Sequence, residues 1–533
     1  MNKEVVIVFD CGATNARAVA VDSGGKIIAS AGFPNSPSAQ KGLPGCLVWD
    51  MDSLWEKLSL ASRKVASLVR RDSVKAVTIT TFGADGTSVD ENGKLTYPVI
   101  SWQCPRTNEI QVKLQIANCK LQKFQPRNLE TTKPRNKYFN HGLTRINTDF
   151  TPEQIYGITG YQIISFNTVL KLMWLRKNAP QALKKAKYWM MMPGLLSHRL
   201  CSEFSIDPTI GSTMMAMDVR RRDWSDAMLG MAGTKRSFFP GWVQPGGTIG
   251  RITRKASAET GLPADIPVIA CGHDTQFALH GCGARADEAV LSTGTWEILM
   301  VRAPKCDPDK KSFDGGLIYE CDAVPGFWNP QILMMGSAVV EWVRRNFYGK
   351  DAASKEIYRL MISEGISSPP GANGVTVIPS FKPDTGPFRR YAVPGTVLGL
   401  SLATNRADIY RAAIEGLSFQ LRSALDILLS AMNYQPPSAI RVVGGGSKND
   451  FWNQMRADTC NLPVTVTGQK EATVLGASMF AFKGISGKSL EEIKKKYAYT
   501  SSEHTFYPSK NSGIYQDLFS RFFKLPSLLE NSH

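Results

Sequence analysis

The chain of 533 residues is 43% apolar and carries a net charge of +17, and a chain of this length is expected to form two or more domains. Residues 111–150 hold eight basic and two acidic residues, and so contribute six of the seventeen excess charges. The remainder is spread thinly, without the basic stripes interleaved with aromatic residues that a nucleic-acid groove needs, so no nucleic-acid partner is expected.

The ten cysteines include no C-x-x-C pair and no spacing to histidine that suggests zinc. They are therefore expected to be reduced, mostly buried thiols of a cytoplasmic protein. No run of about 18 uninterrupted apolar residues occurs, and strand-like sequence begins at Val5 without a preceding signal peptide, so no membrane association is expected.

Residues 5–22 predict two apolar strands joined by a turn of small and polar residues. Asp10 ends the first strand, and Thr14, Asn15 and Arg17 follow it. Backbone N–H groups in such a turn can hold an anion, and Asp10 suits a phosphate site when a divalent cation lies between them. An ordinary hairpin with a surface acid explains the same residues, and this stretch alone does not decide between the two.

Residues 52–71 predict an amphipathic helix, and residues 74–82 predict a buried strand that ends in the loop Phe82-Gly83-Ala84-Asp85-Gly86. Ligands bind at strand ends of mixed α/β sheets, so Asp85 is a candidate for hydrogen bonding to a polyhydroxylated substrate. A turn aspartate that stabilises its own loop is an equally good interpretation.

Trp102, followed by Gln103 and Arg106, could form a sugar-binding edge, because an aromatic face stacks on a sugar while polar groups bind its hydroxyls. An edge tryptophan beside a surface arginine is the more common explanation of this pattern. Lys171 lies in a predicted amphipathic helix and is expected to be solvated. Residues 119–147 show neither the helical nor the strand repeat of apolar residues. They are interpreted as an irregular, basic insertion that ends before a capping box at Thr151.

The proline- and glycine-rich stretch 240–267 predicts the crossing between two domains. A strand then leads into Gly272-His273-Asp274 at the start of a helix. A carboxylate at this junction suits a general base, although helix capping would also explain Asp274. His273 is interpreted as structural.

Residues 289–301 repeat the opening pattern, with Thr293, Gly294 and Thr295 in the turn between two apolar runs. Two such hairpins, each opening a domain-sized segment, indicate duplicated halves that face one cleft. A chance pair of threonine-rich hairpins is the alternative.

Three glycines, Gly444, Gly445 and Gly446, follow another buried strand, and Asn449 precedes the next helix. This arrangement lets the backbone approach a flat ligand and favours a nucleotide site. The helix over residues 472–480 is small on one face, as packing beside such a ligand would require. No G-x-x-x-x-G-K-[ST] motif occurs, so a P-loop is excluded.

In this order the motifs resemble those of the FGGY carbohydrate kinases, which belong to the actin-like ATPase superfold. The resemblance rests on DCGATNARAVAVD (10–22), TTFGADG (80–86), YPVISWQCPRT (97–107), SFNTVLKLMWL (165–175), GHDTQFALHGCGA (272–284), STGTWEILMVR (292–302) and VGGGSKNDFWNQ (443–454). It implies an α/β fold of two actin-like (ribonuclease H-like) domains, 1–258 on the sugar side and 259–533 on the nucleotide side, facing a central cleft.

The resemblance also implies ATP-dependent phosphorylation of a ketose at its primary hydroxyl, with L-fuculose the favoured sugar and Mg²⁺ as cofactor. Kinases for L-rhamnulose, xylulose or glycerol, and an actin-like ATPase without a sugar, remain alternatives. Asp274 is implied as the catalytic base and Asp10 as the metal-side acid. Phosphates are implied at Thr14, Asn15, Arg17, Thr293, Gly294 and Thr295, adenosine at Gly444, Gly445, Gly446 and Asn449, and the sugar near Phe82, Gly83, Asp85, Trp102 and Arg106.

Overall fold

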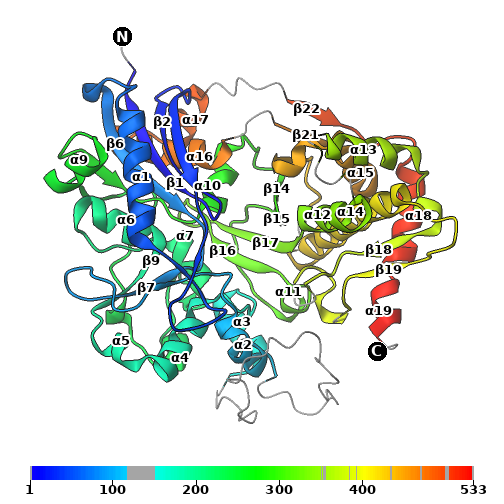
Figure 1. Ribbon diagram of the computed structural model, residues 1–533, viewed down its shortest axis with the longest axis horizontal. Helices are drawn as coiled ribbons and strands as arrows, with labels where there is room; N and C mark the ends of the chain where they lie inside the picture. Colours follow the sequence, from blue (N-terminus) through cyan, green and yellow to red (C-terminus); the bar gives the residue numbers. More distant parts are fainter. Residues whose placement is uncertain are drawn as a thin grey trace.

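The computed structural model describes residues 3–116, 150–349, 351, 354, 356–382, 385–391, 393–432, 435–467, 471–497 and 503–530. The insertion predicted at 119–147 lies outside these residues. Two mixed β-sheets dominate the fold, one in each half of the view in Figure 1. No helix in the described part of the chain is both long and apolar enough to cross a membrane.

The first sheet has six strands in the order β12-β13-β6-β1-β2-β3. The first three strands along the chain form an antiparallel meander, and β6 and β13 lie parallel to β1. This register sets Asp10, at the end of β1, opposite Arg17 of β2 and Thr80 of β6. The strands are β1 Val5–Cys11, β2 Asn15–Asp22, β3 Ile27–Pro34, β6 Val74–Thr81, β12 Thr248–Arg251 and β13 Pro267–Ile269.

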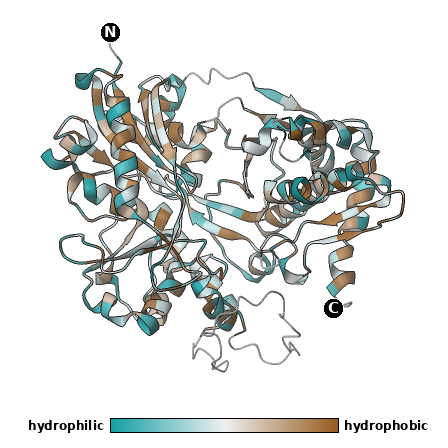
Figure 2. Ribbon diagram, in the orientation of Figure 1, coloured by the Kyte–Doolittle hydropathy of each residue, from teal (hydrophilic) through white to brown (hydrophobic). Residues whose placement is uncertain are grey.

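Helices cover both faces of this sheet, which explains why β1 is buried at every position and apolar at all but Asp10. Alternate side chains of β1, such as Ile7 and Phe9, pack against α1 (Met51–Ala66) and α6 (Met192–Cys201). The side chains between them pack against α16 (Ala472–Ser486) on the other face. Figure 2 shows the result, with brown strands inside and teal positions on the outer helices.

The second sheet has seven strands in the order β16-β17-β15-β14-β20-β21-β22. Its central part, β17-β15-β14-β20-β21, repeats the strand order and directions of β3-β2-β1-β6-β13, so the predicted duplication is confirmed. The strands are β14 Ala289–Thr293, β15 Trp296–Met300, β16 Ile318–Cys321, β17 Trp328–Met335, β20 Ile440–Gly444, β21 Val464–Val466 and β22 His504–Phe506.

Helices also cover the second sheet, seen at the right of Figure 1. The long helix α14 packs its leucines against the sheet and joins a further apolar cluster with its neighbours. These helices are α12 Ser337–Phe347, α13 Ile357–Ser367, α14 Arg406–Met432, α15 Asp450–Cys460 and α18 Ser512–Phe522.

The predicted domain boundary after residue 258 falls inside the first unit. β13 supplies a strand of the first sheet, and α10 (Asp274–Gly281), which follows it, packs against that sheet beside α16. The chain therefore returns to the first unit at α16, before β22 and α18 rejoin the second unit. The stretch 240–267 contains β12 and ends at the first residue of β13, so it is not a simple crossing between the units.

Helices α10 and α16 approach each other unusually closely. A Cβ at Gly476 would lie 1.8 Å from the carbonyl oxygen of Phe277, and a Cβ at Gly281 would lie 1.9 Å from that of Ala472. The small face of α16, which the sequence analysis interpreted as packing beside a ligand, instead packs against α10. This close packing fixes the position of Asp274 at the start of α10.

A smaller five-stranded sheet and several short helices complete the first unit. The capping box predicted at Thr151 is present, with reciprocal bonds between Thr151 and Gln154. The remaining elements include β4 Ser38–Ala39, β5 Leu47–Trp49, β7 Gly86–Val89, β8 Val99–Ile100, β9 Tyr188–Met191, α2 Asn108–Gln115, α3 Pro152–Thr159, α4 Thr168–Asn178, α7 Pro208–Gly211, α8 Asp226–Ala232 and α9 Arg254–Thr260.

Candidate active site

A cavity of about 490 Å³ is lined by residues of both units. The first unit contributes the ends of its strands and the loops beyond them. The second unit contributes one face of its sheet, because alternate residues of neighbouring strands point the same way. The lining includes Phe82, Gly83, Trp102, Tyr161, His273 and Asp274 of the first unit and Trp296, Ile298, Ile318, Glu320, Gln331 and Leu333 of the second.

Asp274 is the first residue of α10, and His273 is the N-cap residue. The Oδ1 atom of Asp274 accepts hydrogen bonds from the backbone N of Thr275 at 2.6 Å and from the Thr275 hydroxyl at 3.2 Å. Within the described residues no hydrogen bond reaches Oδ2. Burial raises the pKa of Asp274 above its ordinary value, His273 opposes the rise, and Asp10 adds to it. A partly exposed carboxylate with one free oxygen facing a cavity can accept a proton.

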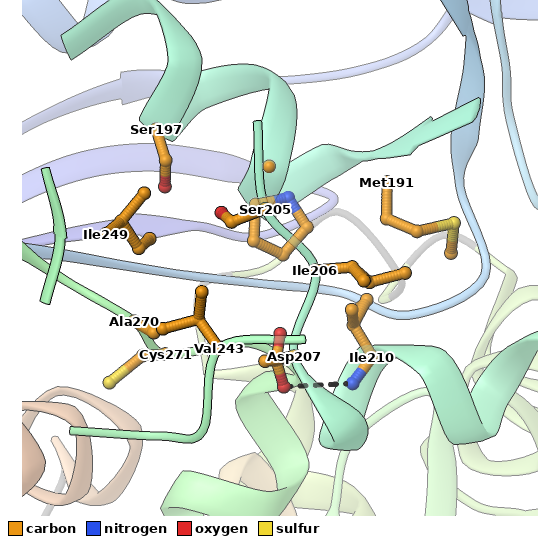
Figure 3. A pocket seen from close by; sticks show the side chains of 12 residues that line it. Met191, Ser197, Ser205, Ile206, Asp207, Ile210, Val243, Ile249, Ala270 and Cys271 are labelled. Atoms are coloured by element: carbon orange, nitrogen blue, oxygen red, sulfur yellow. Dashed lines mark hydrogen bonds between the residues drawn. The ribbon is translucent and has the colours of Figure 1, made fainter. Parts of the chain in front are cut away.

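The backbone of Gly272 and His273 rests against a buried acid in a tightly packed region. Asp207 caps α7 through the backbone N of Thr209 and Ile210, as the dashed line in Figure 3 shows for Ile210. The Thr209 hydroxyl accepts a hydrogen bond from the backbone N of His273 at 2.9 Å. A Cβ at Gly272 would lie 2.2 Å from Asp207 Oδ2, so only glycine allows this contact. The adjoining void, about 10 Å³, has room for no more than a single water.

Asp10 lies at the end of β1, and Arg17 binds it. The guanidinium Nε donates to Asp10 Oδ2 at 3.1 Å, and Nη2 also contacts this oxygen. Arg17 is shared with Glu471, at the start of α16, through Nη1 at 3.1 Å. Burial raises the pKa of Asp10, and Arg17 opposes the rise. In this structure the single positive charge of Arg17 is shared between two carboxylates. Thr14 and Asn15 are exposed in the turn.

In the second unit a single hydroxyl joins the predicted phosphate turn to the glycine-rich loop. Thr293 Oγ1 donates to the carbonyl of Val443 at 2.6 Å and accepts a hydrogen bond from the backbone N of Gly446 at 3.0 Å. Gly444 has φ of 93°, and a Cβ there would lie 2.1 Å from the carbonyl oxygen of Thr293. Gly444 is therefore required by both its conformation and its closeness to the neighbouring strand.

Gly445 faces open space, whereas a Cβ at Gly446 would lie 3.0 Å from the Cβ of Thr293. A Cβ at Gly445 would meet no atom within 4 Å. Asn449 caps α15 by accepting a hydrogen bond from the backbone N of Trp452 at 3.1 Å, and its Nδ2 donates to the hydroxyl of Tyr410 at 3.0 Å. The carbonyl of Gly294 is bound by Ser337, which fixes the neighbouring turn. This set of glycines, hydroxyls and a helix start suits a flat ligand with an anionic group, although the exposed acid Asp450 begins α15 beside it.

Comparisons with known proteins agree with this geometry. The model of the N-terminal domain of the FGGY family of carbohydrate kinases matches residues 5–140 and 140–281, and that of its C-terminal domain matches residues 289–485. The chain belongs to the FGGY family of carbohydrate kinases. It is 36% identical to L-fuculokinase of Escherichia coli K12 over 95% of this chain and 98% of that protein. It is 26% identical to autoinducer-2 kinase of Salmonella typhimurium, over 96% and 92%.

Solved structures show the fold of this FGGY kinase. Xylulose kinase from Lactobacillus acidophilus superposes with a TM-score of 0.83 at 18% identity, covering 99% of this chain and 98% of that one. Glycerol kinase from Plasmodium falciparum, solved with ADP, gives 0.81 at 19% identity and covers 98% and 97%. The expected α/β fold of two actin-like domains is therefore confirmed.

The structure divides the predicted sugar residues of the FGGY kinase into two groups. Phe82, Gly83 and Trp102 line the cavity together with Asp274. Asp85 and Arg106 lie behind its wall and do not line it. Both are buried, so neither the surface arginine nor the simple turn aspartate describes them.

Asp85 forms a buried ion pair with Lys171, and their side chains are 0% and 1% exposed. Lys171 Nζ lies 2.7 Å from Asp85 Oδ1 and donates to the carbonyls of Ala84 and Ile100. The indole of Trp49 donates to the second oxygen of Asp85 at 2.6 Å. The expectation of a solvated Lys171 is wrong. This network holds Ala84, which has φ of 69°, in the loop that lines the cavity.

Arg106 supports the part of the wall that Cys104 forms. Its guanidinium donates to Gln40 Oε1 at 2.6 Å and to Cys104 Sγ at 3.0 Å, and it stacks on Trp174 at 4.9 Å. Cys104 lines the cavity, so Arg106 fixes a wall residue and does not itself face the cavity.

Sequence reasoning missed several polar residues of the cavity, among them Tyr161, His273 and Glu320. His273 precedes Asp274 in the same motif, but the motif alone predicts only a structural role for it. Glu320 lies in no motif that the sequence analysis identified. Its contact with His273 depends on the docking of β16 against the first unit, which the sequence does not display.

The chemistry of the donors fits ATP and a cation held largely by its phosphates. Among the described residues no group of three or more His, Cys, Asp or Glu side chains could hold a metal by itself. Mg²⁺ is commonly bound by one or two carboxylates together with substrate phosphates, so the single acid Asp10 suits it.

Proposed function

We propose that this chain transfers the γ-phosphoryl group of ATP to the primary hydroxyl of a ketose, converting L-fuculose to L-fuculose 1-phosphate. The observation that carries the proposal is Asp274, which lines a cavity formed by both units of a carbohydrate-kinase fold and has one carboxylate oxygen without a hydrogen bond among the described residues. The name L-fuculokinase of the 36% identical relative from Escherichia coli supports the choice of sugar. The free thiols of the described cysteines support the expected cytoplasmic location.

In this reaction Asp274 accepts the proton of the 1-hydroxyl as that oxygen forms a bond to the γ-phosphorus of ATP. The bond between the γ-phosphorus and the bridging oxygen breaks, and ADP leaves with the electron pair. Phosphoryl transfer depends mainly on in-line placement of the reacting groups and on neutralised phosphate charge. The part of the chain is therefore to supply a rigid base and backbone hydrogen-bond donors.

The nucleotide would lie on the second unit. Gly445 and Gly446 let the backbone approach adenosine, while Thr293, Gly294 and Thr295 lie near the phosphates, with Asn449 at the edge of the pocket. Thr14, Asn15 and Arg17 would approach the phosphates from the first unit. Asp10 would hold Mg²⁺, which neutralises phosphate charge when bound with ATP.

On the sugar side, Phe82 and Trp102 would pack against the carbon skeleton, because aromatic rings bind the apolar faces of sugars. Gly83 leaves room for a hydroxyl beside Asp274. Asp85 and Arg106 would act by holding these walls in place.

A coupled assay of ADP release tests the substrate. The panel contains L-fuculose, L-rhamnulose, D-xylulose, L-xylulose, glycerol and the autoinducer-2 signal, and the highest kcat/KM is expected for L-fuculose. A higher value for another member would replace the sugar and keep the reaction. ATP hydrolysis without stimulation by any member would instead favour an actin-like ATPase.

A further inference from the structure

His273 lies between two carboxylates at the cavity. Its Nδ1 lies 2.8 Å from Glu320 Oε2, and its Nε2 lies 3.5 Å from Asp274 Oδ1. A Cβ at Gly83 would come within 3.1 Å of Nε2, so this glycine gives the imidazole edge its place in the cavity wall.

Glu320 comes from β16 of the second sheet and is 1% exposed. Its Oε2 accepts hydrogen bonds from His273 and, at 2.6 Å, from Gln276 Nε2, while its Oε1 accepts one from the Tyr161 hydroxyl at 3.2 Å. Every partner belongs to the first unit. A buried carboxylate with three partners is oriented on both of its oxygens.

The charges around His273 favour the imidazolium. Burial alone would lower the pKa of His273, but Glu320, followed by Asp274 and Asp207, raises it to about 9. Asp10 is the further acid that acts on Asp274. With Nδ1–H given to Glu320, an imidazolium has Nε2–H left for Asp274 and the cavity.

We propose that Glu320 is a positioning residue that holds His273 charged, with Nε2–H directed to an oxygen of the bound sugar beside Asp274. The inference rests on the proposed function and deepens it. His273 keeps its proton throughout, and the hydroxyl proton moves to Asp274. His273 orients the attacking oxygen and favours the ionised form of Asp274 by its charge.

The site is then complete only when the second unit docks on the first. β16 docks through the backbone N of Tyr319, which donates to the carbonyl of Gly160 at 2.8 Å, and that of Cys321, which donates to Ser212 Oγ at 3.1 Å. The carboxylate between them, Glu320, therefore reaches His273 from a fixed strand.

The test compares Glu320→Gln, His273→Gln and the double variant. At saturating ATP, Glu320→Gln is expected to lower kcat/KM for the sugar about tenfold and His273→Gln about 100-fold. The KM for ATP should stay unchanged in both. The double variant should match His273→Gln, because Glu320 acts through His273.

The chain offers a matched control. Asp322, two residues beyond Glu320, pairs with His280 of the same helix α10 at 3.1 Å, and neither lines the cavity. Asp322→Asn should weaken folding and change kcat/KM less than twofold. A loss in this control as large as that of Glu320→Gln would overturn the inference.

A spectroscopic readout separates positioning from stability. The Cε1–H proton signal of His273, identified as the one of six histidine signals lost in His273→Gln, should titrate well above pH 7 in the parent protein. Glu320→Gln should move its midpoint down by more than one pH unit. An unchanged midpoint, or additive losses in the double variant, would overturn the inference. If Asp274→Asn also retained turnover, the proposed function itself would fail.

Discussion

The two sheets share a topology and differ in the charge at their strand ends. In each, three antiparallel strands are followed by two strands parallel to the first. In the first unit two parallel strands have acids at or beyond their ends: Asp10 is the penultimate residue of β1, and Asp274 begins α10 after β13. In the second unit β14, the counterpart of β1, ends at Thr293, and β20 ends at Gly444, the first of three glycines. At these corresponding strands the same scaffold therefore presents carboxylates from the first unit and neutral donors from the second, while Glu320 of β16 is a separate carboxylate of the second unit.

This difference separates two tasks that a single charge pattern could not combine. A carboxylate can accept a proton or bind a cation, but it repels phosphate. Backbone N–H groups and hydroxyls can bind phosphate, but they are poor bases. Placing the two patterns on opposite units lets acceptor and nucleotide meet across one cavity.

The largest expected effect comes from removing the base. Asp274→Asn keeps the shape and hydrogen-bonding capacity of the side chain but cannot accept the hydroxyl proton. Sugar-dependent ADP release should fall by a factor of about 10² to 10⁴, with the KM for ATP unchanged. Turnover near that of the parent protein would remove Asp274 from the mechanism. The same experiment has no counterpart at the corresponding strands of the second unit, because β14 ends at Thr293 and β20 ends at Gly444.

The next effect concerns folding of the sugar side. Lys171→Met fills a similar volume and leaves Asp85 buried without its cation, at a cost of about 3–5 kcal/mol in the free energy of unfolding. Urea unfolding measures this loss. A double variant, Lys171→Met with Asp85→Leu, removes both charges and should recover part of the loss. A loss below about 1 kcal/mol in Lys171→Met would mean that the pair is not buried as described.

This pair also shows where sequence reasoning stops. Apolar runs and turn residues predicted both hairpins, and ordered motifs predicted the fold, because these signals are local. The buried state of Lys171 depends on Asp85, which is distant in sequence, so a single charge in an amphipathic pattern favoured the wrong interpretation. Glu320 was invisible for the same reason. Its role arises from the packing of β16 against α10.

The small face of α16 illustrates a second limit. Gly476 and its neighbours correctly predicted a close approach, but the pattern does not state what approaches. The structure places Phe277 of α10 there, and no cavity. The small residues thus predicted that another element packs closely against α16, whereas only the tertiary fold shows that this element is α10.

A smaller effect is expected at the junction of the units under acid conditions. Burial alone would raise the pKa of Asp322, but His280 and Arg302 lower it to about 2. A folded-state pKa below the ordinary 3.8 stabilises the fold above pH 4, and this stability is lost as the pH falls from 4 towards 2. The difference amounts to about 2 kcal/mol. Asp322→Asn should lose it at pH 7, and the difference between the two proteins should shrink below pH 3. Equal pH dependence in both proteins would contradict this expectation.

The smallest effect tests the charge difference between the units most directly. Gly445 faces open space, so a side chain can be added there without a clash. Gly445→Asp adds a carboxylate to the nucleotide side of the second unit, and Gly445→Asn adds a side chain of the same shape without the charge. Repulsion of one charge at about 7 Å in a partly hydrated site costs about 1 kcal/mol, so the KM for ATP should rise several-fold more in Gly445→Asp than in Gly445→Asn. Salt should reduce the gap, because the charge is exposed. If both variants raise the KM equally, shape and not charge distinguishes the nucleotide side.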